Sequence, residues 1–164
     1  MSRLEVLPDG TANLDITGAW IGADRSVIAE GRADGVILNY ARGFSGPLPD
    51  FTGLPVRRLT ILDRSVTSLE SVYALAPSLE KLSVQTDASA VIELDRLPKL
   101  KELIAHWAQI RASVRYLGHL ESLFVLSYDE VDLEPWRTTP TCPVSPSKTA
   151  PAYAVSMGCK SFRG

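Results

Sequence analysis

Apolar residues recur through the middle of the chain in one motif of three apolar positions, in which two residues separate the first from the second and one residue separates the second from the third. The clear copies are Val56-x-x-Leu59-x-Ile61, Leu79-x-x-Leu82-x-Val84, Leu100-x-x-Leu103-x-Ala105 and Leu120-x-x-Leu123-x-Val125. Their middle leucines follow one another at similar but unequal intervals. A weaker copy, Ala33-x-x-Val36-x-Leu38, lies before the first, and the step from Val36 to Leu59 equals the step from Leu59 to Leu82. Because side chains alternate along a strand, the last two apolar positions of each copy predict a short strand with one buried face.

Each copy is followed by a second set of apolar residues that predicts a return segment. These sets are Val66, Leu69, Val72 and Leu75, then Ala90, Ile92, Leu94 and Leu97, then Ile110, Val114 and Leu117, and finally Val131 and Leu133. Pro55, Pro77 and Pro98 stand just before copies, where the chain must turn into a strand. One copy cannot bury its own apolar face, so the copies are expected to stack and share a core.

This motif resembles that of the leucine-rich repeat family, which is L-x-x-L-x-L-x-x-N/C-x-L at 20–29 residues per copy. The resemblance covers residues 33–134 and departs from the family at the asparagine position, near which Arg64, Asp87, Ala108 and Tyr128 stand. It implies an α/β fold: a leucine-rich-repeat solenoid with a parallel sheet on its concave face. It also implies protein partners.

A helical bundle is the competing interpretation of the same residues. Between residues 97 and 120 the apolar positions also fit a period of 3.6, namely Leu100, Ile104, Trp107, Ile110, Val114 and Leu117. The repeat is preferred because the motif occurs four times with the same internal spacing, which a helical bundle does not require.

The two ends of the chain differ from the repeats, which are expected over residues 33–136. Residues 1–32 read as an N-terminal capping segment with a β-hairpin around Pro8-Asp9-Gly10. Residues 137–164 form a Pro/Ser/Thr-rich basic tail, with four prolines, four basic residues and no acidic one, and predict a weakly ordered extension. Cys142 and Cys159 both lie in this tail, and neither has a role that the sequence assigns.

The residues between the leucines are expected to face out of the sheet in three columns. The first column holds Ile37, Thr60, Ser83, Ile104 and Phe124, the second holds Asn39, Leu62, Gln85, His106 and Leu126, and the third holds Tyr40, Asp63, Thr86, Trp107 and Ser127. Exposed apolar area of this kind marks interaction sites, where aromatic anchors are favoured. The predicted partner-binding residues are Tyr40, Leu62, Asp63, Gln85, Ile104, His106, Trp107, Phe124 and Leu126. Alternatively, the tail or the turns cover these side chains, or Trp107 fills the core beside the small Ala105.

The sequence offers little catalytic chemistry, so the expected function is non-catalytic protein binding. A hydrolase using His106 with Ser127 and Asp63 is the alternative from another class, but Asp63 falls two strands from His106. The cysteines lack neighbours at metal-ligand spacing, and Gly43-Phe44-Ser45-Gly46 lacks the lysine of a phosphate loop, so neither a metal nor a cofactor is expected.

The net charge limits which classes of partner are expected, and the N-terminal sequence limits the expected cellular compartment. The chain carries 17 basic and 19 acidic residues, which excludes a broad basic face for nucleic acid. The arginines at 42, 57, 58 and 64 are therefore expected to form salt bridges or meet an acidic partner. No secretory signal or membrane span is expected, which favours a cytoplasmic protein. A shortened structural repeat protein that self-associates through the open edge of its last repeat is a further alternative.

Overall fold

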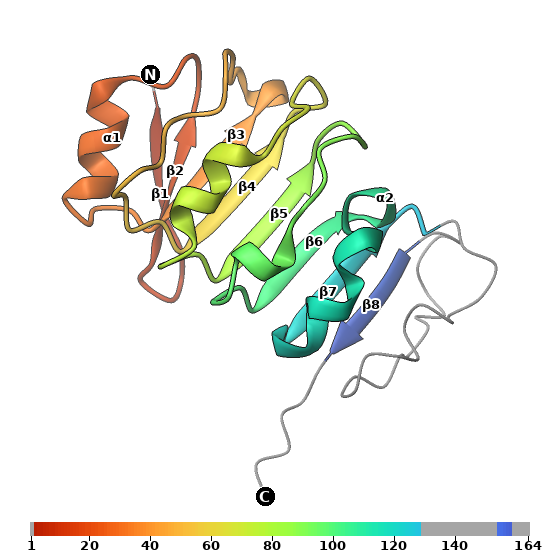
Figure 1. Cartoon of the computed structure of the whole chain (residues 1–164). Coiled ribbons are helices and arrows are strands. Elements are labelled where there is room, and N and C mark those ends of the chain that lie inside the picture. The colour runs from red at the N-terminus through yellow and green to blue at the C-terminus, as the bar shows by residue number, and fades with distance from the viewer. Residues whose placement is uncertain (1, 129–153, 159–164) are drawn as a thin grey trace, which may run out of the picture.

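The chain forms an α/β fold around one open, mostly parallel sheet (Figure 1). The computed structural model describes residues 2–128 and 154–158. The strands lie in the sheet in the order in which they occur in the chain, β1 to β8. Strands β2 to β7 are parallel, whereas β1 and β8 at the two ends are antiparallel to their neighbours. The strands are β1 (Arg3–Val6), β2 (Ala12–Ile16), β3 (Gly35–Asn39), β4 (Arg58–Leu62), β5 (Lys81–Gln85), β6 (Glu102–His106), β7 (Ser122–Leu126) and β8 (Ala154–Gly158).

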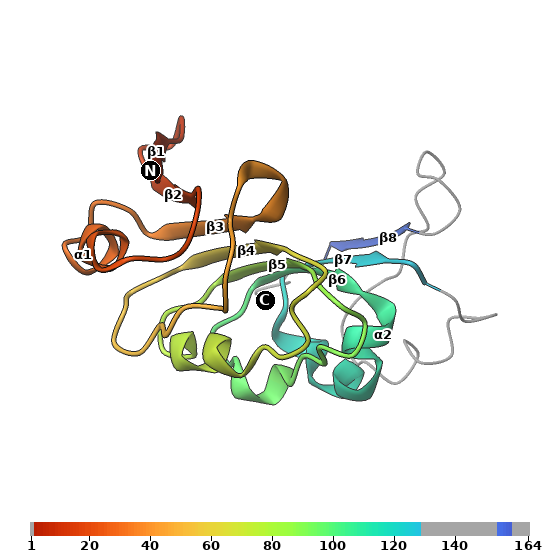
Figure 2. The same cartoon turned by 90° about the horizontal axis from the view of Figure 1, so that it is seen from above.

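The helical segments of the described chain are short. They are α1 (Gly22–Ala29), α2 (Trp107–Ile110) and the 3₁₀ segments η1 (Tyr40–Arg42), η2 (Glu70–Leu75), η3 (Leu94–Arg96) and η4 (Arg111–His119). The segments that follow β4, β5 and β6 all lie on one face of the sheet (Figure 2). One sheet face is therefore covered by the returning chain. We call the opposite side of β3 to β7 the outward face.

In the sheet, equivalent residues of the repeated motif are paired on neighbouring strands. Leu59 of β4 is the Cα partner of Leu82 of β5, which is in turn the partner of Leu103 of β6. Val36 extends this row at one end and Leu123 at the other. The copies aligned in the sequence thus lie side by side in the sheet, and the predicted strands are confirmed.

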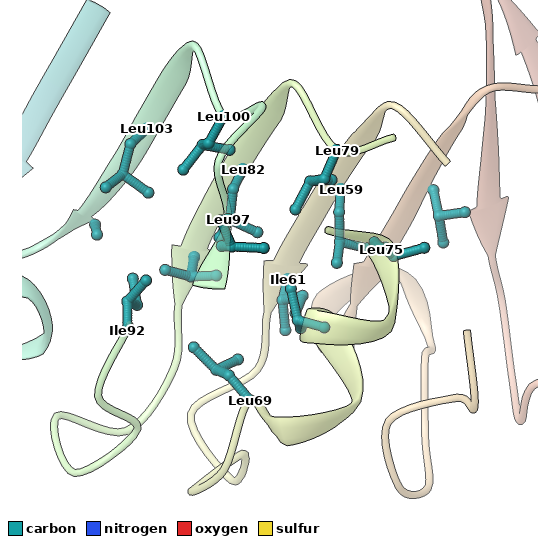
Figure 3. Packing of buried hydrophobic residues seen from close by; sticks show 14 of the residues in the cluster. Leu59, Ile61, Leu69, Leu75, Leu79, Leu82, Ile92, Leu97, Leu100 and Leu103 are labelled. Carbon is teal, nitrogen blue, oxygen red and sulfur yellow. The ribbon is translucent and has the colours of Figure 1, made fainter. Parts of the chain in front are cut away.

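The core lies between the buried side of these strands and the return segments. Figure 3 shows Leu59, Ile61 and Leu82 of the strands together with Leu69 and Leu75 of the return. All of these side chains are buried, and they belong to one continuous cluster. Leu79, Ile92, Leu97, Leu100 and Leu103 continue the same layer along the sheet.

The helical interpretation of residues 97–120 is wrong for the first part of that segment. Residues 102–106 form β6, and Ile104 lies on the outward face rather than in a helical core. Helical structure occurs only after the strand, where α2 begins at Trp107 and η4 follows from Arg111. A strand followed directly by a helix produces a pattern that resembles one longer helix.

The N-terminal hairpin is confirmed, and its second strand has an additional role. β1 and β2 pair in antiparallel fashion around the Pro8-Asp9-Gly10 turn, where Gly10 has a φ of 83°. Leu14 and Ile16 of β2 are also the parallel partners of Val36 and Leu38. β2 is therefore one more strand in the repeating register, and α1 connects it to β3.

The C-terminal segment departs from its prediction at one place. Residues 154–158, within the tail expected to be weakly ordered, form β8 on the outer edge of β7. The β7 edge is therefore occupied, which corrects the expectation of an open edge on the last repeat. The rest of the tail, with Cys142 and Cys159, lies outside the described residues, and so do Val131 and Leu133 of the last predicted return segment.

Arg58 joins β4 to the hairpin beside Gly35, where the missing side chain leaves room for Asn13. Its guanidinium donates hydrogen bonds to the side chains of Thr11 and Asn13 and to the carbonyl of Ala12, and it pairs with Asp34 at 2.8 Å. A Cβ at Gly35 would overlap Oδ1 of Asn13 and lie 3.2 Å from Nε of Arg58. The absence of a side chain at Gly35 is thus a condition for this network.

We expect Gly35→Ala to lower the free energy of unfolding by about 1–3 kcal/mol, the usual cost of overpacking. The added methyl group displaces Asn13 and disturbs the hydrogen bonds of Arg58. Chemical denaturation measures the loss. Gly22→Ala is the matched control, because no atom lies within 4 Å of the added Cβ at the start of α1. Equal stability of the two variants would contradict the requirement for glycine at position 35.

Candidate interaction face

The outward face carries the first two predicted columns in register. Ile37, Thr60, Ser83, Ile104 and Phe124 are successive Cα partners across β3 to β7. In the second column, Asn39 pairs with Leu62, Leu62 with Gln85, and His106 with Leu126. All of these side chains are exposed or half-buried. The geometry of these two columns follows from the alternation of side chains along a strand.

The third predicted column does not face outward as a row. Asp63, Thr86 and Trp107 are buried, and Trp107 is only 1% exposed. The reason is the same alternation: Asp63 lies two residues after Ile61 and therefore returns to the buried side. Tyr40 and Ser127 are exposed, but they lie beyond the ends of β3 and β7. The prediction that Trp107 and Asp63 contact a partner is therefore wrong. Trp107 belongs instead to the core that includes Ala105.

An apolar patch lies on the outward face of the last two parallel strands. It consists of Ile104 on β6 with Phe124 and Leu126 on β7, and Ile104 is the direct Cα partner of Phe124. Ile104 is 38% exposed, and the other two are half-buried. Leu62 on β4 is separated from this patch by Ser83 and Gln85 of β5. Of the five apolar side chains in the two outward columns, three therefore lie on β6 and β7, and the other two are Ile37 and Leu62.

A hollow of about 210 Å³ adjoins the patch at Ile104. It lies over β4, β5 and β6, and Leu7 of the hairpin closes one side. Lys81 and Glu102 line it and form an ion pair at 2.8 Å. Ligand pockets for small molecules are commonly about 300–1,000 Å³. The size of this hollow suits an inserted side chain better than a whole cofactor.

Polar side chains satisfy backbone groups at the bends that follow β4 and β6. After β4, Oδ1 of Asp63 accepts from the backbone N–H of Ser65 at 2.9 Å. After β6, the fully buried Gln109 accepts from the N–H of His106 at 3.1 Å and donates to Oγ1 of Thr86 at 2.7 Å. Gln109 therefore fixes the bend at which His106 ends its strand. The sequence does not distinguish Gln109 from the other polar residues of this return segment, such as Arg111 and Ser113.

His106 contacts one of its two predicted catalytic partners. Its Nδ1 lies 3.2 Å from Oγ of Ser127, which has a φ of 52° in the left-handed region. Burial lowers the pKa of His106, and the nearby positive charge of Arg64 lowers it further. The carboxylate of Asp63 instead accepts from Oγ of Ser65 at 2.7 Å and follows β4, two strands away. The three groups do not converge.

Three of the four arginines at positions 42, 57, 58 and 64 form ion pairs. Arg57 pairs with Glu80 at 2.8 Å and Arg58 with Asp34 at 2.8 Å. Arg42 pairs at 2.7 Å with Asp15, whose hydrogen bond raises the pKa of the arginine. The prediction of salt bridging is confirmed for these three residues.

Comparisons with known proteins found no significant match among protein-family models, curated proteins or solved structures. Within residues 2–128 and 154–158, no group of three histidine, cysteine or carboxylate side chains is placed to hold a metal ion. The helices of that same part of the chain are all too short or too polar to cross a membrane.

Proposed function

We propose that this chain is a short leucine-rich-repeat solenoid that binds a protein partner through its outward face, without catalysis. The apolar patch of Ile104, Phe124 and Leu126 carries this proposal, because aligned apolar side chains on adjacent strands stay accessible there. The neighbouring hollow offers an apolar wall from Leu7 and Ile104 beside the charged pair of Lys81 and Glu102. An apolar centre with a polar rim is the common arrangement of protein interfaces.

The repeat assignment is supported by a hydrogen-bond pattern that recurs before each strand. The carbonyl of Arg57 accepts from Glu80 at 2.8 Å and Lys81 at 3.0 Å, and the carbonyl of Glu80 accepts from Lys101 at 2.8 Å and Glu102 at 3.0 Å. Lys101 accepts in the same way from residues 121 and 122 at 2.8 and 3.0 Å. Equivalent residues of successive copies thus bond to one another beyond the strands, as expected for stacked repeats.

A hydrolytic role is the second candidate, and it rests on the contact between His106 and Ser127. A serine–histidine mechanism uses a carboxylate to orient the imidazole. Asp63, the carboxylate proposed for that task, is bonded to Ser65. The binding role is therefore the better supported of the two.

The binding proposal is tested by affinity capture from native lysate with Ile104→Glu as the disrupting variant. Val91→Glu is the matched control, because Val91 is 45% exposed and lies outside the outward face. A protein captured by the wild type and by Val91→Glu, lost with a folded Ile104→Glu and reconstituted from purified components supports the proposal. Equal capture by all three proteins would place the site elsewhere, and no specific capture would contradict a recognition role.

A further inference from the structure

Strand β1 forms an accessible edge of the sheet. It lies at one end of the strand order, and all four of its residues are exposed. Leu4 is 44% exposed and Val6 is 68% exposed, although both are apolar. Proteins protect exposed edge strands by short length, charged side chains, proline, a bulge or a covering segment. β1 is short and carries Arg3 and Glu5, charges that only a strand with the opposite pattern can neutralise. Residues 3–6 contain no proline, and within the part of the chain that the structure describes they pair with β2 alone.

The hairpin turn determines which backbone groups of β1 point away from the sheet. The N–H of Leu7 donates to the carbonyl of Thr11 at 2.8 Å, so residues 7 and 11 form a hydrogen-bonded pair. Hydrogen-bonded and non-bonded pairs alternate along antiparallel strands. Glu5 and Arg3 therefore direct their backbone groups toward β2. Leu4 and Val6 direct theirs to the free edge, where they can pair with another strand.

The sequence of β1 complements itself in one antiparallel register. When two copies of β1 pair about Leu4, each Arg3 lies opposite the Glu5 of the other copy, and the two leucines face each other. Opposite charges in such cross-strand pairs stabilise a sheet, whereas like charges destabilise it. A register centred on Glu5 would oppose two carboxylates, and one centred on Arg3 would oppose two guanidinium groups. A register centred on Val6 would bring Pro8, which has no N–H, opposite Leu4.

We propose that β1 is a self-association strand through which two copies of this chain form a symmetric dimer with one continuous sheet. The pairing is centred on Leu4, whose outward N–H donates to the carbonyl of Leu4 in the second copy and whose carbonyl accepts from the N–H of that residue. The side chain of Leu4 shares a sheet face with its partner Leu14, which is buried, so the two Leu4 side chains extend the apolar layer across the junction. This proposal is independent of the outward face.

Sedimentation equilibrium of the full chain across a concentration series tests the dimer. Arg3→Glu and Glu5→Arg should each be monomeric at concentrations where the wild type is a dimer. The double exchange Arg3→Glu/Glu5→Arg restores the opposite charges and should recover the dimer. A mixture of the two single variants should form a heterodimer. Thermal melts confirm that these exposed changes leave the fold intact.

Leu4→Pro supplies an independent variant, because the N–H that it removes is not used in pairing with β2. It should abolish the dimer without unfolding the hairpin. A wild type that stays monomeric throughout would overturn the proposal, and so would a dimer that none of these variants affects. A mass that grows beyond two copies would indicate head-to-tail pairing of β1 with β8 and would also overturn it.

Discussion

Replacing Leu82 by aspartate is expected to abolish cooperative folding. Leu82 is 2% exposed and lies between Leu59 and Leu103 in the register of the sheet. An unpaired carboxylate at this place costs several kcal/mol, a large share of a stability that is typically about 5–15 kcal/mol. Leu103→Asp is expected to have the same effect, since Leu103 is the next member of the buried row. Thermal unfolding followed by circular dichroism measures both variants.

Gln85→Asp is the matched control for this prediction. It introduces the same carboxyl group on the same strand, but Gln85 is exposed on the outward face. Its melting temperature is expected to stay close to that of the wild type. A cooperative transition retained by Leu82→Asp would mean that the row of Leu59, Leu82 and Leu103 is not the buried one.

Truncation of Trp107 to alanine is expected to lower the free energy of unfolding by about 3–5 kcal/mol, as for other large buried aromatic residues. Trp107 is 1% exposed at the start of α2, and its ring centroid lies 4.9 Å from that of Tyr128. The substitution removes most of a buried side chain and leaves a cavity that the surrounding segments only partly fill. Chemical denaturation with the midpoint and slope determined separately gives the loss.

Tyr40→Ala provides the comparison at an exposed aromatic residue. Tyr40 is 60% exposed, and its truncation is expected to change stability by less than about 0.5 kcal/mol, as for most surface substitutions. Similar losses in the two variants would contradict the burial of Trp107. The prediction also has a practical result: a binding test that removes Trp107 would confuse lost folding with lost contact.

The strand positions are predictable from the sequence because two constraints agree in every copy. The period-two alternation selects the buried residues, and the repeated spacing selects the partners. Leu59 and Leu82 can therefore be paired from the sequence alone. The same reasoning does not identify β2 as a member of the parallel array, because the apolar pattern of its residues is already accounted for by the hairpin with β1. The step from Leu14 to Val36 nevertheless has the length of a repeat.

The candidate site is less predictable, because it depends on where each strand ends. Counting a third column places Asp63 and Trp107 outward, but the alternation returns them to the buried side. The contact between His106 and Ser127 depends on the left-handed backbone at Ser127, for which the sequence holds no glycine or asparagine signal. The pairing of β8 with β7 joins segments that are distant in the sequence, beyond the reach of local patterns.

The unequal spacing of the aligned leucines has a consequence for how this chain tolerates changes in length. The step from Leu59 to Leu82 is longer than the step from Leu103 to Leu123, yet both pairs lie in strands of equal length and in the same register. The difference is absorbed entirely by the return segments. Short insertions and deletions are therefore compatible with the fold between strands. Within a strand, one added residue would exchange the buried and exposed sides of everything that follows it in that strand.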